Sequence, residues 1–251
     1  MPYLYETHLH TCEGSACGEV SGPDYIDYLI GKGYNGMVVT DHFFTGNCAV
    51  DRTLPWKERV ELYCEGFRKA KEASQGRDFD VIFGMEYNFD GDEFLIYGLN
   101  RQWLLNNPDV MTLDRHGLYK LVKESGGIMV HAHPFRERNY LKDIKLTPDV
   151  CDGIEVYNAA NSANMNALAY KYALQLKLPM TGGSDIHYFH DKPMGGVLSP
   201  DRITSTVEFK DALLAGCLTP VQVFEGKITP VTQLPEQINP EGYPTFPVLL
   251  T

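Results

Sequence analysis

The residues of this sequence best suited to chemistry are histidines and carboxylates at the ends of short apolar runs. Four segments carry them: residues 6–10 (ETHLH), 40–42 (TDH), 131–134 (HAHP) and 182–187 (GGSDIH). Because residues i and i+2 of a β-strand point to the same face, side chains at this spacing project together. The pairs so spaced are His8 with His10, His131 with His133, and Asp185 with His187. Imidazole and carboxylate together suit zinc, manganese or iron better than calcium or magnesium.

These ligands outnumber what one metal ion needs. The candidates are His8, His10, His42, Glu86, His131, His133, Asp185 and His187. A tetrahedral zinc ion takes three or four protein ligands, so we predict a centre of two or three divalent ions, which would be Zn, Mn or Fe. Glu86 can bridge two of them, since each carboxylate oxygen can bind one ion. Ions about 3.5 to 4 Å apart form the clamp used in phosphoester and amide hydrolysis.

Alternating strand-like and helix-like segments must position these ligands. Apolar runs predict strands over residues 4–10, 36–40, 80–86, 94–99, 128–130, 153–158 and 180–185. Helical spacing of apolar residues predicts helices over residues 23–32, 56–74, 113–125, 163–176 and 207–215. Such alternation is typical of a largely parallel α/β fold. Seven strands with polar residues at their C-terminal ends favour a closed or slightly distorted barrel with the metal site at those ends.

Composition and charge narrow the class of protein. The 251 residues are 43% hydrophobic and 22% charged, which is ordinary for a globular chain, and we expect one domain over residues 1–251 with a Pro-rich tail over residues 230–251. The formal net charge of -11 argues against nucleic acid as the main partner. No apolar run reaches the roughly 20 residues of a membrane span. The first residues do not resemble a signal peptide and the six cysteines are dispersed, so a cytoplasmic location is expected.

The order of the motifs resembles the PHP family, named for polymerase and histidinol phosphatase. The motifs H-x-H, T-D-H, G-x-E, A-H-P and G-S-D-x-H follow one another within residues 3–200. The resemblance implies a distorted (β/α)7 TIM-like barrel with a trinuclear metal centre that hydrolyses phosphoesters. It also implies which residues hold each ion: His8, His10 and Asp185 the first, Glu86 and His133 the second, His42 and His187 the third. Asp41 would orient a histidine from outside the ligand shell.

Three positions depart from the family pattern. The family often has an Asp or His shortly after H-x-H, and residues 11–18 (TCEGSACG) offer Glu13, favoured by metal hardness, or Cys17, favoured by the alignment of the glycine. Many members have a histidine where this chain has Leu95, so we expect one ligand of the second ion to be lost. His131 is an addition, and we expect it to replace that ligand or to bind the substrate.

Polar residues after the predicted strands would contact a phosphate. A guanidinium matches two oxygens of a phosphate dianion. Arg136 follows His133 in the same loop and matches an arginine of the family, with Arg138 as the reserve. Further residues expected in polar loops at this end of the fold are Asn158, Asn161 and Lys192.

The reaction would also need proton transfer. A metal-activated hydroxide would attack phosphorus, and the leaving alkoxide would take a proton from a histidine not fully committed to metal. His131 and His190 are the candidates for this donor. Asp185 is the ligand whose loss we expect to abolish turnover.

The leading functional hypothesis is metal-dependent hydrolysis of a phosphate ester of a small metabolite, either a phosphomonoester or a small or cyclic phosphodiester. A nuclease of the exonuclease type is an alternative, but it needs a basic channel or a stacking platform, and the acidic balance opposes it. A non-catalytic metal-binding module with a degenerate second metal site is another. A surplus of ligands beyond the four that a structural site needs argues against that module. Substrate identity and oligomeric state stay open.

Overall fold

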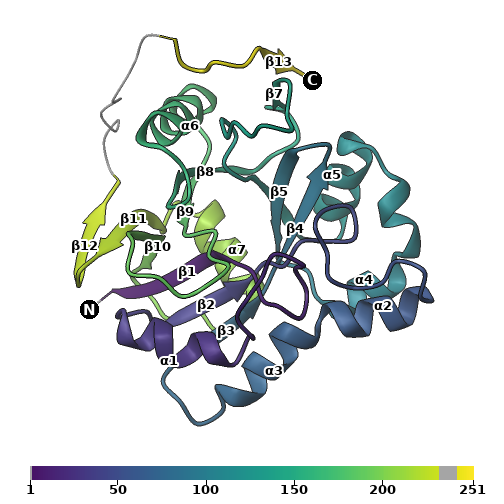
Figure 1. The fold of residues 1–251 in the computed structure, drawn as a ribbon, viewed down its shortest axis with the longest axis vertical. Coiled ribbons are helices and arrows are strands. Elements are labelled where there is room, and N and C mark those ends of the chain that lie inside the picture. The colour runs from purple at the N-terminus through teal and green to yellow at the C-terminus, as the bar shows by residue number, and fades with distance from the viewer. Residues whose placement is uncertain (1, 232–241) are drawn as a thin grey trace.

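The computed structural model describes residues 2–231 and 242–251 as an α/β fold with several sheets (Figure 1). The largest sheet has the strand order β12-β11-β10-β1-β2-β3. Its strands are β1 (Tyr3–Leu9), β2 (Gly36–Val39), β3 (Asp80–Phe83), β10 (Met194–Ser199), β11 (Thr219–Phe224) and β12 (Lys227–Pro230). The pairs β1–β2 and β2–β3 are parallel, whereas β10 runs antiparallel to β1 and to β11.

A second sheet has the order β4-β5-β6-β8-β9, and a short pair joins β13 to β7. The strands are β4 (Met85–Phe89), β5 (Asp92–Tyr97), β6 (Ile128–His131), β8 (Gly153–Asn158), β9 (Met180–Gly183), β7 (Ile144–Leu146) and β13 (Val248–Leu250). Strands β4, β5 and β6 pair antiparallel, and β6, β8 and β9 pair parallel. The fold is therefore mixed rather than largely parallel.

Helices cover the outer faces of both sheets (Figure 1), except α7, which packs into the core between them. They are α1 (Asp24–Gly31), α2 (Trp56–Tyr63), α3 (Glu65–Ala73), α4 (Arg101–Asn106), the 3-10 helix η1 (Pro108–Thr112), α5 (Arg115–Glu124), α6 (Ala163–Leu176) and α7 (Thr206–Leu214). The side chains of Asp114, Ser162 and Ser205 each accept a hydrogen bond from the backbone N–H three residues on. Such N-caps satisfy N–H groups that have no partner within the helix, which explains where α5, α6 and α7 begin.

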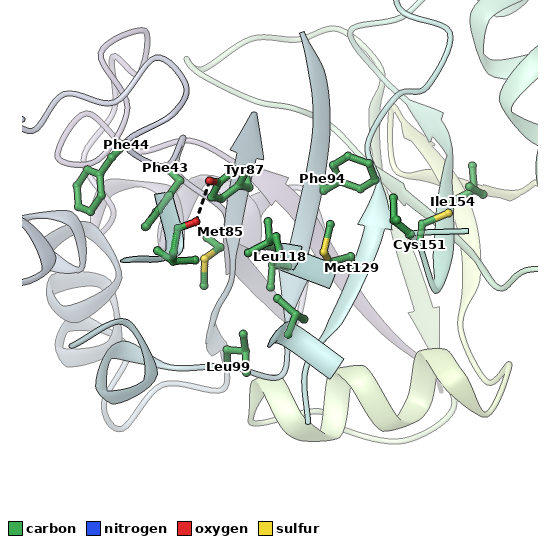
Figure 2. Close-up of a cluster of buried hydrophobic side chains, with 14 of the residues drawn as sticks. Phe43, Phe44, Met85, Tyr87, Phe94, Leu99, Leu118, Met129, Cys151 and Ile154 are labelled. Carbon is green, nitrogen blue, oxygen red and sulfur yellow. Dashed lines mark hydrogen bonds between the residues drawn. The ribbon is translucent and has the colours of Figure 1, made fainter. Parts of the chain in front are cut away.

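The two large sheets share a buried core. Tyr5, Val38 and Val197 come from the first sheet, and they belong to the same hydrophobic cluster as Leu95 and Val130 of the second. Helix α7 adds Phe209 and Leu213 to it. A further cluster fills the space between the second sheet and α2, α4 and α5, where Phe43, Tyr87, Leu118 and Met129 are among the buried side chains (Figure 2).

The C-terminal ends of strands from both sheets meet at one place. Isolated parallel bridges join Leu9 to Ile186 and His42 to Glu86. Backbone hydrogen bonds strengthen the second contact, because Phe43 N donates to the Glu86 carbonyl at 2.7 Å and Glu86 N donates to the Asp41 carbonyl at 3.0 Å. Leu9 and Ile186 are therefore neighbours of predicted metal ligands in the chain, and His42 and Glu86 are themselves predicted ligands.

A closed barrel is not shown, since the described strands make separate sheets. One reason lies in the segment predicted as a single strand over 80–86, which divides at Gly84 into β3 and β4. A second reason is the two-residue turn of Asp90 and Gly91, which have φ of 51° and 91°. Positive φ at both central residues suits a tight β-hairpin, and it returns the chain antiparallel as β5.

Other boundaries differ locally. The helix predicted over 56–74 is two helices that meet at Cys64. Strands β10, β11 and β12 were not predicted, although their residues include valines and aromatic residues typical of strands. The predicted Pro-rich tail over 230–251 lies partly outside the described residues, and its last part forms β13 against β7.

Candidate metal centre

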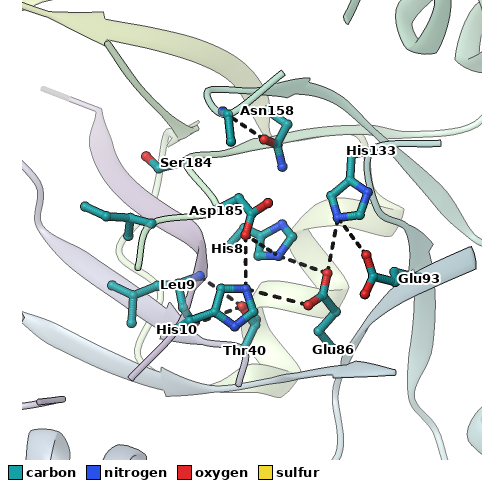
Figure 3. A network of polar contacts seen from close by, with 12 residues as sticks. His8, Leu9, His10, Thr40, Glu86, Glu93, His133, Asn158, Ser184 and Asp185 are labelled. Carbon is teal, nitrogen blue, oxygen red and sulfur yellow. Dashed lines mark hydrogen bonds and ion pairs between the residues drawn. The ribbon is translucent and has the colours of Figure 1, made fainter. Parts of the chain in front are cut away.

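The predicted metal ligands converge where loops after β1, β2, β6 and β9 meet β4 (Figure 3). Groups whose ligand atoms all lie within 4.8 Å of one another are His8–His10–Asp185, His8–Glu86–His133, His10–His42–His187 and His42–Glu86–Glu93. Every predicted ligand except His131 and Glu13 belongs to at least one group. Glu93 is a member that the sequence analysis did not propose.

Several ligand atoms face this centre without a hydrogen bond. Within the described part of the chain, the buried atoms His8 Nε2, His10 Nε2, His42 Nδ1 and Glu86 Oε2 have no hydrogen-bond partner. Their close polar contacts are with one another or with a further carboxylate: Glu86 Oε2 lies 2.6 Å from His42 Nδ1, and His10 Nε2 lies 3.1 Å from Asp185 Oδ1. Imidazole nitrogens and carboxylate oxygens converging in this way are the donor set of a divalent transition metal. The residues present therefore fit the metal centre that the fold implies.

Hydrogen bonds from behind orient the two histidines of β1. His8 Nδ1 lies 2.8 Å from Glu155 Oε1, and His10 Nδ1 lies 3.1 Å from Ser15 Oγ. Ser15 Oγ in turn donates to Asp41 Oδ1 at 2.7 Å. With Nδ1 engaged, each ring presents Nε2 to the centre, which is how ligating histidines are commonly fixed. Asp41 thus acts on His10 through Ser15, and Glu155 and Ser15 are supporting residues that sequence reasoning missed.

A glycine makes the close approach behind His8 possible. A Cβ on Gly183 would lie 2.5 Å from His8 Cβ and 2.9 Å from Glu155 Oε1. Any larger residue there would displace the ring or its carboxylate. Gly183 therefore serves close packing of β9 against β1, whereas Gly182 packs against Gly196 of β10 and Pro220 of β11.

Glu86 lies among four imidazoles. Its Oε1 is 3.2 Å from both His8 Nε2 and His133 Nε2, and its Oε2 is 2.6 Å from His42 Nδ1 and 3.6 Å from His10 Nε2. Burial alone would raise the pKa of this carboxyl, but His42 and His8 hold it well below its usual range. Glu86 is therefore a carboxylate with one oxygen facing each side of the centre, the arrangement that a bridging ligand needs.

The guanidinium of Arg136 holds Asp185. The same guanidinium binds two asparagines that were predicted to contact the substrate. Arg136 Nη1 donates to Asp185 Oδ2, its Nη2 donates to Asn158 Oδ1 at 2.7 Å and its Nε donates to Asn161 Oδ1 at 2.8 Å. Burial would raise the pKa of Asp185, but Arg136 and His8 hold it well below its usual range. The structure therefore brings Arg136, Asn158 and Asn161 together at the centre.

His131 does not share a face with His133, contrary to the expectation from their spacing. Strand β6 ends at His131, and His133 has a φ of 28°. This turn in the backbone breaks the alternation, so His133 points to Glu86 while His131 Nε2 lies 2.8 Å from Asp92 Oδ1 and its ring stacks on Phe94. His131 is thus placed in a separate buried ion pair rather than among the converging ligands.

Glu93 occupies the side of the centre next to His133. Its Oε2 lies 3.5 Å from His133 Nε2, and its Oε1 accepts a hydrogen bond from Asn88 Nδ2 at 2.8 Å. Burial and the negative charge of Glu86 raise the pKa of Glu93. One signal for Glu93 was available in the sequence: it lies two residues before Leu95 and so on the same face of the strand.

The outermost group of ligands consists of His42 and His187, with Cys17 beside them. His42 and His187 side chains are 13% and 22% exposed, in contrast to the fully buried His8 and His10. Although burial opposes it, hydrogen bonds from His187 and His42 lower the pKa of Cys17 to about 6. Glu13 lies elsewhere, accepting from Gly22 N at 3.1 Å and facing Lys69. Of the two alternatives for this position, Cys17 is the one that lies beside His42 and His187, and neither belongs to a group of converging ligand atoms among the described residues.

Two clefts open from the centre. One of about 470 Å³ is lined by residues that include His42, Glu93 and Tyr140, and one of about 310 Å³ by residues that include His190 and Lys192. Arg138, Asp185 and His187 line both clefts. Arg138 is exposed, and among the described residues it makes no ion pair closer than 4.0 Å. Both clefts therefore reach residues of the centre.

No protein-family model matches the chain, and no curated protein matches it. Solved structures do. A two-domain protein of Bacteroides vulgatus ATCC 8482, which contains a predicted PHP-like metal-dependent phosphoesterase, superposes with a TM-score of 0.65 at 18% identity over 91% of this chain. This chain spans 66% of that protein. A proposed metal-dependent phosphoesterase of Bifidobacterium adolescentis ATCC 15703 superposes with a TM-score of 0.56 at 16% identity, over 84% of this chain and 96% of the other.

A third similar structure is an amidohydrolase of Chromobacterium violaceum, solved with bound sulfate and no metal. Its TM-score is 0.51 at 13% identity, over 85% of this chain and 96% of the other. At these identities the likeness concerns the fold. The predicted resemblance to the PHP family is confirmed at that level. No helix within residues 2–231 and 242–251 is both long enough and apolar enough to cross a membrane.

Proposed function

We propose that this protein is a metal-dependent hydrolase that cleaves a phosphate ester of a small metabolite, a phosphomonoester or a small or cyclic phosphodiester. The observation that carries the proposal is the convergence of histidine nitrogens and carboxylate oxygens into groups whose ligand atoms lie within 4.8 Å of one another. The fold shared with proteins described as metal-dependent phosphoesterases supports it. So does sulfate in the amidohydrolase structure, because sulfate resembles phosphate in shape and charge.

Two or three divalent ions would occupy the centre. His8, His10 and Asp185 would hold the first, and Glu86 would connect it to a second beside His133. His42 and His187 would hold the third. When bound, such ions supply Lewis acidity and lower the pKa of a water molecule so that it is nucleophilic near neutral pH.

The side chains around the ligands would bind and orient the substrate. Arg136 is committed to Asp185, Asn158 and Asn161, so its charge is fixed at the edge of the centre. Arg138 is free to reach a phosphate in either cleft. His190 Nδ1 accepts from Lys192 N at 3.3 Å, which keeps the proton of the neutral ring on Nε2. We assign that N–H a hydrogen bond to the leaving-group oxygen.

We also propose that residues 1–251 form one domain and that the two large sheets represent an opened PHP-type (β/α)7 barrel. The core shared by strands of both sheets supports this proposal. The bridges at Leu9–Ile186 and His42–Glu86 support it as well, because they join the sheets at the end where the ligands lie.

Metal content and hydrolysis, measured on the same purified sample, test the function. Elemental analysis would count the ions, and p-nitrophenyl phosphate and its bis ester would be assayed with and without added manganese. We expect two or three ions per chain, and loss of turnover in Asp185→Asn but not in Asp191→Asn, whose side chain is fully exposed. One ion or none, with no turnover under any metal, would overturn the proposal in favour of a non-catalytic metal-binding module.

A further inference from the structure

The two sides of the metal centre differ in the chemistry of their ligands. On one side His10, His42 and His187 form a group of three imidazoles. On the other side Glu86 and Glu93 lie beside His133, and the same two carboxylates also form a group with His42, which borders both sides. Two carboxylates and one imidazole make a harder donor set than three imidazoles. The two sides are therefore not equivalent sites for the same ion.

The β4–β5 hairpin places Glu93 at the centre. Glu93 pairs with Asn88 across the hairpin, and Glu86 pairs with Leu95. Ala132 N donates to the Glu93 carbonyl at 2.9 Å, which fixes β5 next to the loop that carries His133. Asn88 Nδ2 engages Oε1 of Glu93, so Oε2 is the oxygen directed to His133 (Figure 3). The carboxylate is thus oriented before any ion binds.

Leu95 cannot contribute a ligand, and its surroundings explain why Glu93 can. Leu95 is fully buried and packs with Tyr97 and Val130 in the core between the sheets. Glu93 lies one strand repeat nearer the open end of the same face, and its side chain is 15% exposed. The independent sign of a ligand position is that Glu93 and Glu86 form, with His42, a group whose ligand atoms all lie within 4.8 Å of one another.

We propose that Glu93 is a metal ligand and that Glu86, Glu93 and His133 form a carboxylate-rich subsite. The preference for zinc over manganese is weaker in this subsite than in the subsite formed by His10, His42 and His187. The proposal rests on the proposed function, because it names the ions of that same centre. Zinc binds more tightly than manganese to most sites, so the inference concerns the ratio of the two affinities. In a mixture of both ions, manganese enters the carboxylate-rich subsite and zinc the histidine-rich one.

Metal-free full-length protein, titrated with Mn²⁺ alone, Zn²⁺ alone and then both, tests this assignment. The readouts are ion counts by elemental analysis and the electron paramagnetic resonance signal of bound Mn²⁺. We expect Glu93→Gln to weaken manganese binding by roughly tenfold or more and to leave zinc in the histidine-rich subsite. Glu93→His should keep the number of ions and exchange manganese for zinc. Asp90→Asn, an exposed carboxylate of the same hairpin, should bind both ions as the wild type does.

The outcomes separate this inference from the proposed function. If wild type and Asp90→Asn hydrolyse phosphoesters and Glu93→Gln binds manganese as they do, Glu93 is not a ligand and only the inference fails. If the wild type binds no ion, the proposed function fails. Should Glu93→Gln not fold, as judged by circular dichroism, Glu93→His decides: an unchanged ratio of manganese to zinc overturns the assignment.

Discussion

The inner and outer halves of the metal centre are built differently. The inner histidines, His8 and His10, are fully buried, and hydrogen bonds to Glu155 and Ser15 hold their rings. The outer histidines, His42 and His187, are partly exposed, and His187 Nδ1 lies 2.9 Å from the backbone carbonyl of Asp185. The inner half is thus held by packing between the sheets, and the outer half by loops. On the proposed assignment, the ion held by His42 and His187 would exchange most readily.

Removing one histidine from each half should give the largest difference in the free energy of unfolding. His8→Ala removes the imidazole paired with the buried carboxylate of Glu155, and breaking a buried pair costs about 3–5 kcal/mol. His187→Ala removes a partly exposed ring and should cost no more than about 1 kcal/mol. Urea unfolding of the metal-free proteins measures both values. Equal losses of stability would contradict the proposed difference between the halves.

Neutralising Glu155, the carboxylate that contacts His8 Nδ1, should lower the metal affinity of the inner half without removing a ligand. Glu155 accepts from His133 N and Asn158 Nδ2 as well as contacting His8. We expect Glu155→Gln to reduce metal affinity by about 10–100-fold, since partners behind the ligands have effects of that size. Isothermal titration with Zn²⁺ measures it, with Glu124→Gln on the surface of α5 as the control. An unchanged affinity would mean that packing alone orients His8.

The chain of hydrogen bonds from Asp41 through Ser15 to His10 should support the metal centre less than Glu155 does. Ser15→Ala removes the hydroxyl between these residues, leaving His10 Nδ1 buried without a partner, and should cost about 1–3 kcal/mol of stability. Because Ser15 also accepts from His42 N, the loss should reach both halves of the centre. Thermal unfolding compared with Ser21→Ala measures the effect. No loss of stability would show that this chain of hydrogen bonds is dispensable.

The smallest expected effect is a difference between Cys17 and Cys12 in how their alkylation rates depend on pH. In metal-free protein Cys17, with a pKa of about 6, is mostly thiolate at pH 7, so its rate should level off above that pH. Cys12 is exposed and its pKa is raised by burial and by Glu13, so its rate should keep rising beyond pH 8. Mass spectrometry after iodoacetamide treatment follows both residues. Parallel pH profiles would contradict the assigned contact of Cys17 with His42 and His187.

Elements with strong local signals could be predicted from the sequence. The helix expected over 163–176 is α6 with the same bounds, because apolar spacing and the Ser162 cap both mark it. The strand expected over 153–158 is β8. The hairpin at Asp90 and Gly91 was missed, although that pair of residues is a strong turn signal. Without this turn, β4 and β5 were predicted as two strands of a parallel barrel, whereas they form one antiparallel hairpin.

Residues that act through distant parts of the chain could not be predicted in the same way. Glu155 lies 147 positions from His8 along the chain, and no local pattern connects them. His131 was assigned to the centre by its spacing from His133, and a single positive φ at His133 separated the two rings. Strand alternation holds only while the backbone stays extended, so predictions that extend past a strand end fail at such turns.

The sequence alone determined the types of metal ligand present and most of the positions that carry them, because ligand chemistry depends on residue type and the motifs are short. Only the tertiary structure decided which carboxylates join them. Glu93 enters through the register of the β4–β5 hairpin, and Glu155 through the packing of β8 beside β9 and β1. Register and packing arise from contacts between segments far apart in the chain, and those contacts form only when the whole core is buried.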